Sequence, residues 1–453
     1  MKNGDEIIIL QILHKGDICI SLKIHKIINM KIVIKFSRIM CCLLLIMPLV
    51  DIITGNALSS QSSGLLVYLG QLYRVIILIY ASYIIYSKPF SNKELWLPIF
   101  TFYVILLVFF NYARFNGSII ENLSYTMKLL LPIYLIISLK IIIIKNYNII
   151  DKLFKTYSWI YPLSLLIPWL LNVGYNISNY TFESGYRGFY FANNELNVIL
   201  MVIFVYCYQE LYDNLIAHRK SAHKVKIDWI NIIKLFLNLL ALFLIGSKTS
   251  ILAIMIVCFA YLYKKENLKK KLKYIILFTS TGIVSFILII NILSSQISNM
   301  FQRIIYSYNR FVNTEGVITF LLSTRNLRIK PGIQYWFNDG MEGLINFLFG
   351  VGKSNKCPNN GIGINAFAII EMDFFDCLFW FGFIASCIVF VFYLSHFIRV
   401  IKIKNMFMEK SIFILVFSFS ILAGHVIISA NSGTIFALVI AKLYTKIYNL
   451  NNA

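Results

Sequence analysis

The stretch FSRIMCCLLLIMPLVDII, residues 36–53, decides the fold class of this chain. It is an almost uninterrupted apolar run. Crossing a hydrocarbon layer of ~30 Å takes roughly 20 residues of helix that rises about 1.5 Å per residue. The stretch is therefore long enough and apolar enough to be a transmembrane helix. Comparable runs recur along the whole chain.

The composition favours a membrane protein built from many such helices. Of 453 residues, 59% are hydrophobic and 14% are charged, whereas about a quarter of the residues of a soluble domain are charged. The sequence predicts an all-α, polytopic integral membrane helix bundle with about 12 transmembrane helices. These spans fall near residues 36–53, 65–86, 95–113, 126–144, 157–174, 193–212, 229–246, 249–263, 274–293, 374–398, 411–428 and 432–448.

The distribution of Lys and Arg predicts the orientation of the bundle. The basic runs Lys264-Lys265 and Lys269-Lys270-Lys271 fall on one side, whereas the short connections on the other side carry only Arg114, Arg187 and Lys248. Because Lys and Arg accumulate in cytoplasmic loops, both termini are expected in the cytoplasm. The same bias accounts for the net charge of +22 without a nucleic-acid partner.

The spans divide the chain into four parts. Residues 1–30 form an N-terminal cytoplasmic extension, 31–293 hold helices 1–9, 294–370 form a long extracytoplasmic loop, and 371–453 hold helices 10–12. Met30-Lys31 leads directly into the first span and is typical of a natural start. Residues 1–29 are therefore expected to be dispensable, and N-terminal sequencing of the native protein tests this.

The long loop is not disordered by composition. Two sets of apolar residues recur at helical spacing, which predicts amphipathic helices that lie on the membrane surface, cap the bundle or cover a substrate. The first set is Ile297, Phe301, Ile304, Ile305, Tyr308 and Phe311, and the second is Ile333, Trp336, Phe337, Leu344, Phe347 and Leu348.

Cysteine and histidine placement argues against metal and disulfide chemistry. Of eight cysteines, only Cys357 falls in an outer loop, and no CxxC spacing occurs. We therefore expect no disulfide framework, no structural zinc and no cofactor. Among the six histidines, only His425 lies near the outer end of a span. A single histidine there is either a packed core residue or a base.

Six cations are expected at the outer side, where the orientation bias tends to remove them. Charged groups within a bilayer are costly, so each one raises a functional hypothesis. Any single cation can be explained by snorkelling or by a structural ion pair. The set predicts an anionic ligand near the outer leaflet. Its members are Arg74, Lys128, Arg187, Lys248, Arg325 and Arg328.

Three acids, Glu371, Asp373 and Asp376, stand at the head of the tenth span. Asp373 and Asp376 share one helix face if the helix has begun there. They either complement the positive N-terminus of that helix or act in proton transfer. Both readings stay open.

Four motifs together resemble a known family. They are GYRGFYFANNELN at 185–197, GSKTS at 246–250, FGVG at 349–352, and EMDFFD at 371–376 continuing through Trp380-Phe-Gly382. Their order and placement over roughly residues 180–400 resemble the O-antigen polymerase and ligase superfamily, Wzy-type. Lys248 stands where family members often carry Arg, which weakens a bidentate phosphate contact there.

The resemblance implies polymerisation of undecaprenyl-diphosphate-linked oligosaccharide repeat units into capsular or O-antigen-type polysaccharide, on the outer face of the cytoplasmic membrane of a bacterium. An acceptor hydroxyl would attack the anomeric carbon of the lipid-linked chain, without a metal. Arg187 and Arg325 are the leading candidates for diphosphate contact, followed by Arg74, Lys248, Arg328 and Lys128. Asp373, Glu371 or His425 would accept the proton, and Tyr335 and Trp336 would stack on sugar rings.

Two other functions remain as alternatives. Ligases of the same superfamily usually carry a histidine in the long loop, and this loop has none. A lipid-linked oligosaccharide flippase would be expected to show related halves, which this chain lacks. The sequence leaves open whether a chain-length regulator and a flippase are protein partners.

Overall fold

The fold is described from a computed structural model. It describes residues 36–62, 64–87, 95–144, 146, 148–179, 182–220, 229–247, 291, 294–338, 340–353, 370–402, 407–422 and 424–452. The N-terminal extension, Cys357, Lys248 and the spans predicted near 249–263 and 274–293 lie outside the described residues.

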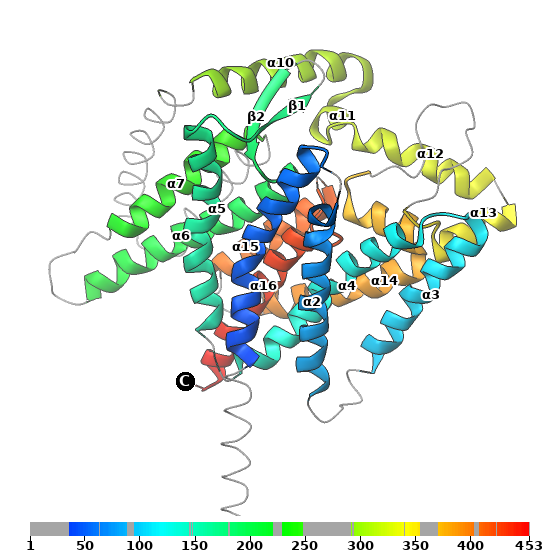
Figure 1. Cartoon of the computed structure of the whole chain (residues 1–453), viewed down its shortest axis with the longest axis horizontal. Coiled ribbons are helices and arrows are strands. Elements are labelled where there is room, and N and C mark those ends of the chain that lie inside the picture. Colours follow the sequence, from blue (N-terminus) through cyan, green and yellow to red (C-terminus); the bar gives the residue numbers. More distant parts are fainter. Residues whose placement is uncertain are drawn as a thin grey trace, which may run out of the picture.

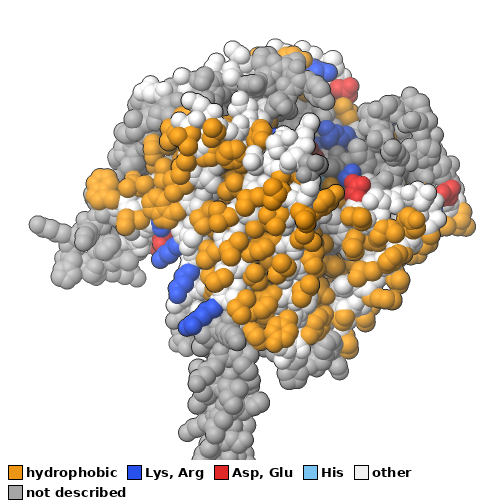
Figure 2. Space-filling model, in the orientation of Figure 1, with side chains coloured by type: hydrophobic (Ala, Val, Ile, Leu, Met, Phe, Trp, Pro, Cys, Tyr) orange, Lys and Arg blue, Asp and Glu red, His pale blue; other side chains and the backbone are white. Residues whose placement is uncertain are grey.

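Six described helices are long and apolar enough to cross a membrane, so the chain is a multi-pass membrane protein. Figure 2 shows their hydrophobic side chains covering most of the visible side of the bundle. Such a surface suits contact with lipid rather than with water. These helices are Phe36–Ser59, α2 (Leu65–Tyr86), α3 (Trp96–Phe115), α4 (Ile119–Ile143), α6 (Asn193–Lys220) and α14 (Asp373–Lys402).

Helix α4 is the centre of the bundle, because it packs against α2, α3 and α16 and most of its residues are buried.

Four further helices overlap predicted spans. Of the twelve predicted spans, six match the long apolar helices, four overlap these helices in residue range, and two lie outside the described residues except for residue 291. The four are α5 (Ile149–Leu170), α7 (Trp229–Ile245), α15 (Phe407–Leu422) and α16 (Ala430–Asn452).

Two helices begin earlier than the apolar pattern predicts. Helix α4 begins at Ile119 rather than near residue 126, and α5 begins at Ile149 rather than near 157. Hydropathy identifies only the apolar part of a helix. Helix α4 begins before that part, with a first turn that contains Glu121. The Ser118 hydroxyl caps that turn by accepting a hydrogen bond from the Glu121 N–H at 3.2 Å.

No strand is predicted from the all-α sequence pattern, but a small hairpin precedes α6. Strands β1 (Tyr175–Asn179) and β2 (Phe182–Gly188) pair antiparallel. The hairpin packs against α5 and α7. At Gly185, whose φ is +92°, a Cβ atom would lie 2.0 Å from the Ile245 carbonyl oxygen. Only glycine allows this close approach between the hairpin and the end of α7.

The segment between α7 and α14 contains helices where amphipathic helices were predicted. In Figure 1, the helices run in an arc across the top and upper right of the bundle, away from the C-terminus at the bottom. We call the part of the bundle beneath them the covered end. The helices are α10 (Ser294–Glu315), α11 (Val317–Leu321), α12 (Arg325–Asn338) and α13 (Gly340–Phe349).

A glycine contact joins this segment to the bundle. Helix α14 is kinked at Gly382, where φ is 79° and ψ is 174°, a conformation that is essentially restricted to glycine. A Cβ atom at Gly382 would lie 2.3 Å from the Leu348 carbonyl oxygen at the end of α13. The kink therefore lets the end of α13 approach the backbone of α14.

We expect Gly382→Ala to lower the free energy of unfolding by about 3 kcal/mol or more, because backbone strain and a steric clash combine. Thermal unfolding in detergent micelles measures the effect. Gly340→Ala is the matched control: Gly340 also has a positive φ, of 55°, but a Cβ there meets no atom within 4 Å. Equal losses in the two variants would contradict the role of the close contact.

Candidate functional site

The segment before α14 is held by one buried carboxylate. Asp376 is fully buried, and its Oδ1 accepts the Ile370 N–H at 2.8 Å. Its Oδ2 accepts the N–H groups of Glu371 at 3.0 Å and Met372 at 3.2 Å. Glu371 takes a φ of +67°, which is uncommon outside glycine. The three hydrogen bonds stabilise this conformation and set the position of Glu371.

A second carboxylate, one turn earlier, holds the segment between α15 and α16. Asp373 is also fully buried, and its Oδ2 accepts the Ser420 hydroxyl and the N–H groups of Val426 and Ile427, the latter two at 2.7 Å. These bonds fix the backbone next to His425. The first turn of α14 therefore holds two separate segments at one place.

His425 lies against both carboxylates. Its Nδ1 is 3.6 Å from Asp376 Oδ2 and 3.9 Å from Asp373 Oδ1. Its side chain is 20% exposed, whereas both aspartates are at 0%. Of these three groups, only the imidazole can therefore meet a ligand from outside the protein.

Glu371 is joined to the segment that covers this end of the bundle. Its Oε2 accepts a hydrogen bond from Arg325 Nη2 at 2.7 Å. This bond joins the start of α12 to the residues just before α14. Asn194, at the start of α6, donates to the same oxygen at 3.4 Å. The Glu371 side chain remains 33% exposed. Arg325 thus joins α12 to the segment before α14, and its guanidinium lies beside a carboxylate that is partly exposed.

Two lysines complete this group of charges. His425 lies close enough to interact electrostatically with Glu371, Arg325, Lys128 and Lys353. Lys128 comes from α4, and its ammonium lies 4.2 Å from the centre of the Tyr125 ring. Lys353 follows α13. We call these five residues, Lys128, Arg325, Lys353, Glu371 and His425, the charged cluster.

Arg74 is neutralised by an acid that the sequence analysis did not select. Its Nη2 lies 2.7 Å from Asp51 Oδ1 and 2.6 Å from Asn431 Oδ1. Asp51 is buried in the helix Phe36–Ser59. The ion pair ties α2 to that helix, and the hydrogen bond that Arg74 donates to Asn431 ties α2 to α16. Arg74 also interacts electrostatically with Lys128.

Arg187 lies apart, in the β-hairpin. It donates to the Phe191 carbonyl oxygen at 2.7 Å, and its guanidinium lies 5.6 Å from the Tyr175 ring. Partial burial lowers the pKa of Arg187 from its usual value, and Tyr175 acts in the opposite direction. Within the described ranges, no carboxylate forms an ion pair with it, and no described contact joins it to the charged cluster.

The remaining selected residues have different environments. Trp336 is 8% exposed, stacks on Phe379 at 4.4 Å and meets Phe347 edge-on at 5.2 Å. Its indole therefore packs α12 and α13 against α14, which leaves little of it for a sugar. The side chain of Tyr335 is outside the described part. Arg328 is half-buried on α12, three residues and so nearly one turn after Arg325.

Lys353 is the cluster member that the sequence analysis did not select. It directly follows the FGVG motif, and this position is the sequence feature that could have indicated Lys353 as a site residue. Within the described residues, no group of three or more His, Cys, Asp or Glu is arranged to hold a metal ion. Comparison of the chain with protein-family models, curated proteins and solved structures finds no match.

We expect Asp376→Asn to lower the free energy of unfolding by at least about 2 kcal/mol, because an amide NH₂ would face buried N–H groups that the carboxylate now accepts. Thermal unfolding in detergent micelles checks this. Glu121→Gln is the control, since it makes the same chemical change on an exposed side chain of α4. An unchanged unfolding temperature for Asp376→Asn would contradict the holding role.

Proposed function

We propose that this protein polymerises undecaprenyl-diphosphate-linked oligosaccharide repeat units into capsular or O-antigen-type polysaccharide, on the outer face of a bacterial cytoplasmic membrane. The observation that carries the proposal is the charged cluster. Arg325 is paired with Glu371 at 2.7 Å, Lys128 and Lys353 both lie over the Tyr125 ring, and all three cations interact electrostatically with His425. The family resemblance of residues 180–400 points the same way.

The chemistry requires two kinds of group, and the cluster contains both. The acceptor hydroxyl forms a bond to the anomeric carbon while the bond from that carbon to the diphosphate oxygen breaks. Negative charge grows on the departing diphosphate, which cations positioned in advance stabilise without a metal. Arg325, Lys128 and Lys353 would supply this charge. A base must take the hydroxyl proton.

Exposure favours Glu371 and His425 as the proton acceptor. Both are partly accessible, at 33% and 20% of the side chain, whereas Asp373 is fully buried and its Oδ2 accepts three hydrogen bonds. In this proposal, Asp373 and Asp376 orient the two accessible groups. Direct proton transfer to Asp373 stays a prediction from the sequence.

The other cations predicted to contact the diphosphate have different surroundings. Arg74 is paired with Asp51 at 2.7 Å, as Arg325 is with Glu371, so diphosphate contact by Arg74 stays a prediction. Arg187 forms no described ion pair, and several of its N–H groups remain available. Diphosphate contact by Arg187 therefore stays a prediction, as do the contacts predicted for Lys248 and Arg328.

Purified protein supplied only with lipid-linked repeat units, in the presence of a chelator, should produce longer chains. Arg325→Ala should lower the rate by about 100-fold or more, because one charge-stabilising contact to the leaving group is lost. Arg187→Ala should lower the rate of chain growth as strongly, while both variants still insert into the membrane. Gel analysis of product length measures both. Arg310→Ala, on the exposed face of α10, is the matched control; wild-type chain lengths in both test variants would end the diphosphate assignment.

Deletion of the gene separates this function from its rivals. A polymerase mutant should display single repeat units on lipid at the outer face and make no long chains. Material that stalls at the inner face would indicate a flippase instead. Long chains that stay on the lipid without transfer to a second acceptor would indicate a ligase.

A further inference from the structure

The outward face of α13 is apolar, although this helix belongs to the segment predicted to lie outside the membrane. Four of its residues share one side of the helix, because their spacing is i, i+3, i+4 and i+7. They are Met341, Leu344, Ile345 and Leu348. Met341 is 74% exposed and Leu344 is 50% exposed. A helix that covers a protein in water carries polar residues on this side, so the surroundings of α13 are expected to be apolar.

The opposite side of α13 packs against the protein and is not uniformly apolar. Asn346 is fully buried there. Gly343 is also buried, and a Cβ atom at this position would lie 2.0 Å from the Trp336 carbonyl oxygen of α12. Helix α13 packs against α14 as well. A polar side chain inside and an apolar outer face are typical of a helix that meets lipid.

Helix α3 indicates the depth at which the end of α13 lies. Helix α3 contains 20 residues, a length of about 30 Å that just crosses a hydrocarbon layer. Phe110 lies roughly 7–8 Å before the end of that helix at Phe115. The Phe110 ring meets the Phe349 ring edge-on, with the ring centres 5.6 Å apart. The end of α13 therefore lies beside a part of α3 that is within the hydrocarbon layer.

The start of α13 lies about one turn nearer the outer end of α3. Glu342, the one charged residue in the sequence of α13, lies 3.5 Å from Arg114 in the last turn of α3. Figure 1 shows α13 at the right edge of the molecule, beside the upper end of α3. The ion pair is thus at the rim, and the aromatic pair is further in. This order is expected of a helix that enters the outer leaflet obliquely.

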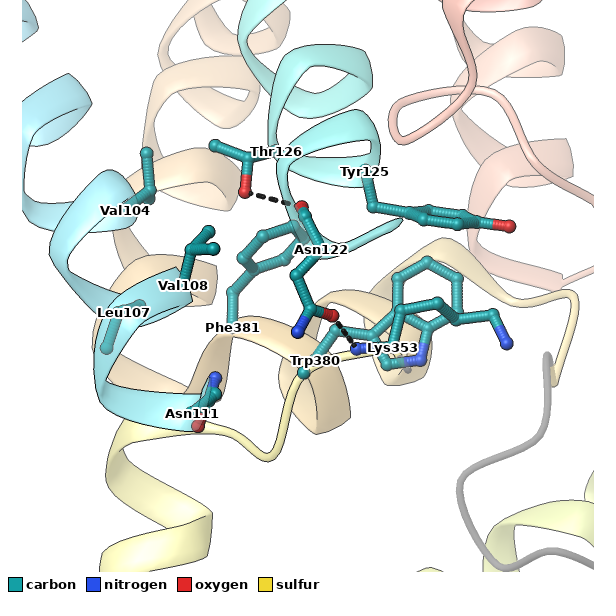
Figure 3. A pocket seen from close by; sticks show the side chains of 11 residues that line it. Val104, Leu107, Val108, Asn111, Asn122, Tyr125, Thr126, Lys353, Trp380 and Phe381 are labelled. Atoms are coloured by element: carbon teal, nitrogen blue, oxygen red, sulfur yellow. Dashed lines mark hydrogen bonds between the residues drawn. The ribbon is translucent and has the colours of Figure 1, made fainter. Parts of the chain in front are cut away.

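The apolar face of α13 adjoins the lipid-facing surfaces of two neighbouring spans, α3 and α14. In Figure 3, Val104 and Val108 of α3 lie on the side turned toward α4 and α14. Phe109, on another side of α3, is 54% exposed. On α14, Phe383 is 44% exposed, and its ring stacks on that of Phe347 at 5.1 Å. Figure 2 shows hydrophobic side chains over this flank of the molecule. The surface that meets lipid on the spans therefore extends onto α13.

We propose that α13 is embedded in the outer leaflet of the membrane, with Met341 and Leu344 against the acyl chains of phospholipids. The segment 294–370, predicted as one outer loop, then returns to the membrane at α13 before α14 begins. A second copy of this chain could bury the same residues, but the continuity with the exposed faces of α3 and α14 favours lipid. This inference is independent of the proposed function, because it concerns only the depth of α13.

A photoreactive benzophenone amino acid placed at Leu344 tests the contact. The full chain is irradiated in vesicles of phosphatidylethanolamine and phosphatidylglycerol, and mass spectrometry of its peptides identifies the molecules that have been captured. We expect phospholipid adducts at position 344, because the side chain there points into the acyl chains. Asn309, which is exposed on α10, is the control position. We expect no phospholipid adduct there.

Leu344→Cys and Asn309→Cys give an independent measurement with small substitutions. A maleimide that cannot cross the membrane reacts with a thiolate in water. We expect Leu344→Cys to react at least about tenfold more slowly than Asn309→Cys in the vesicles, because a thiolate is costly in hydrocarbon. Both variants should react equally after denaturation. Peptide mass spectrometry locates the label, so the eight native cysteines do not interfere.

Four results would overturn the inference. Capture of a second protein chain at position 344 would assign the apolar face to an interface between copies. The absence of a phospholipid adduct at 344, or equal adducts at 344 and 309, would remove the evidence for a lipid contact specific to α13. Labelling of Leu344→Cys as fast as Asn309→Cys would place α13 in water.

Discussion

Two buried carboxylates on the first turn of α14 are the constraint on which the site depends. Asp373 and Asp376 together accept five backbone N–H groups, two from the segment before α16 and three from the segment before α14. In an apolar interior, an N–H group without a partner is costly. The two segments are therefore held where the carboxylates are, and His425 and Glu371 are brought to one place.

The cations are arranged in two ways around this framework. Arg74 and Arg325 each lie 2.7 Å from a carboxylate oxygen. The first ion pair joins two consecutive helices, and the second joins α12 to the segment before α14. Lys128 and Lys353 instead lie over the Tyr125 ring, where a cation is stabilised without being neutralised. The charged cluster therefore combines a fixed ion pair with two lysine ammonium groups that no described carboxylate neutralises at ion-pair distance. This arrangement suits a ligand that carries more than one negative charge.

The helices over the covered end are attached to the bundle by packing as well as by charge. Trp336 lies between Phe347 and Phe379, and the kink at Gly382 admits the end of α13. The chain then leaves α13 through Gly350 and Gly352, both with positive φ, and reaches Lys353. The contacts that attach α13 to α14 thus also place Lys353 against Asn122 and Tyr125 of α4.

The sequence by itself determined the membrane class, most of the helices, and the helical character of residues 294–349, because apolar length and periodicity are local properties. It also selected Arg325, Glu371 and His425 as site residues. Only the tertiary structure decided that Asp51 neutralises Arg74, that Lys353 joins the cluster, that Trp336 is packing, and that residues 175–188 form a hairpin. Each of these depends on which side chains or strands meet in the fold, and neither hydropathy nor spacing encodes those contacts.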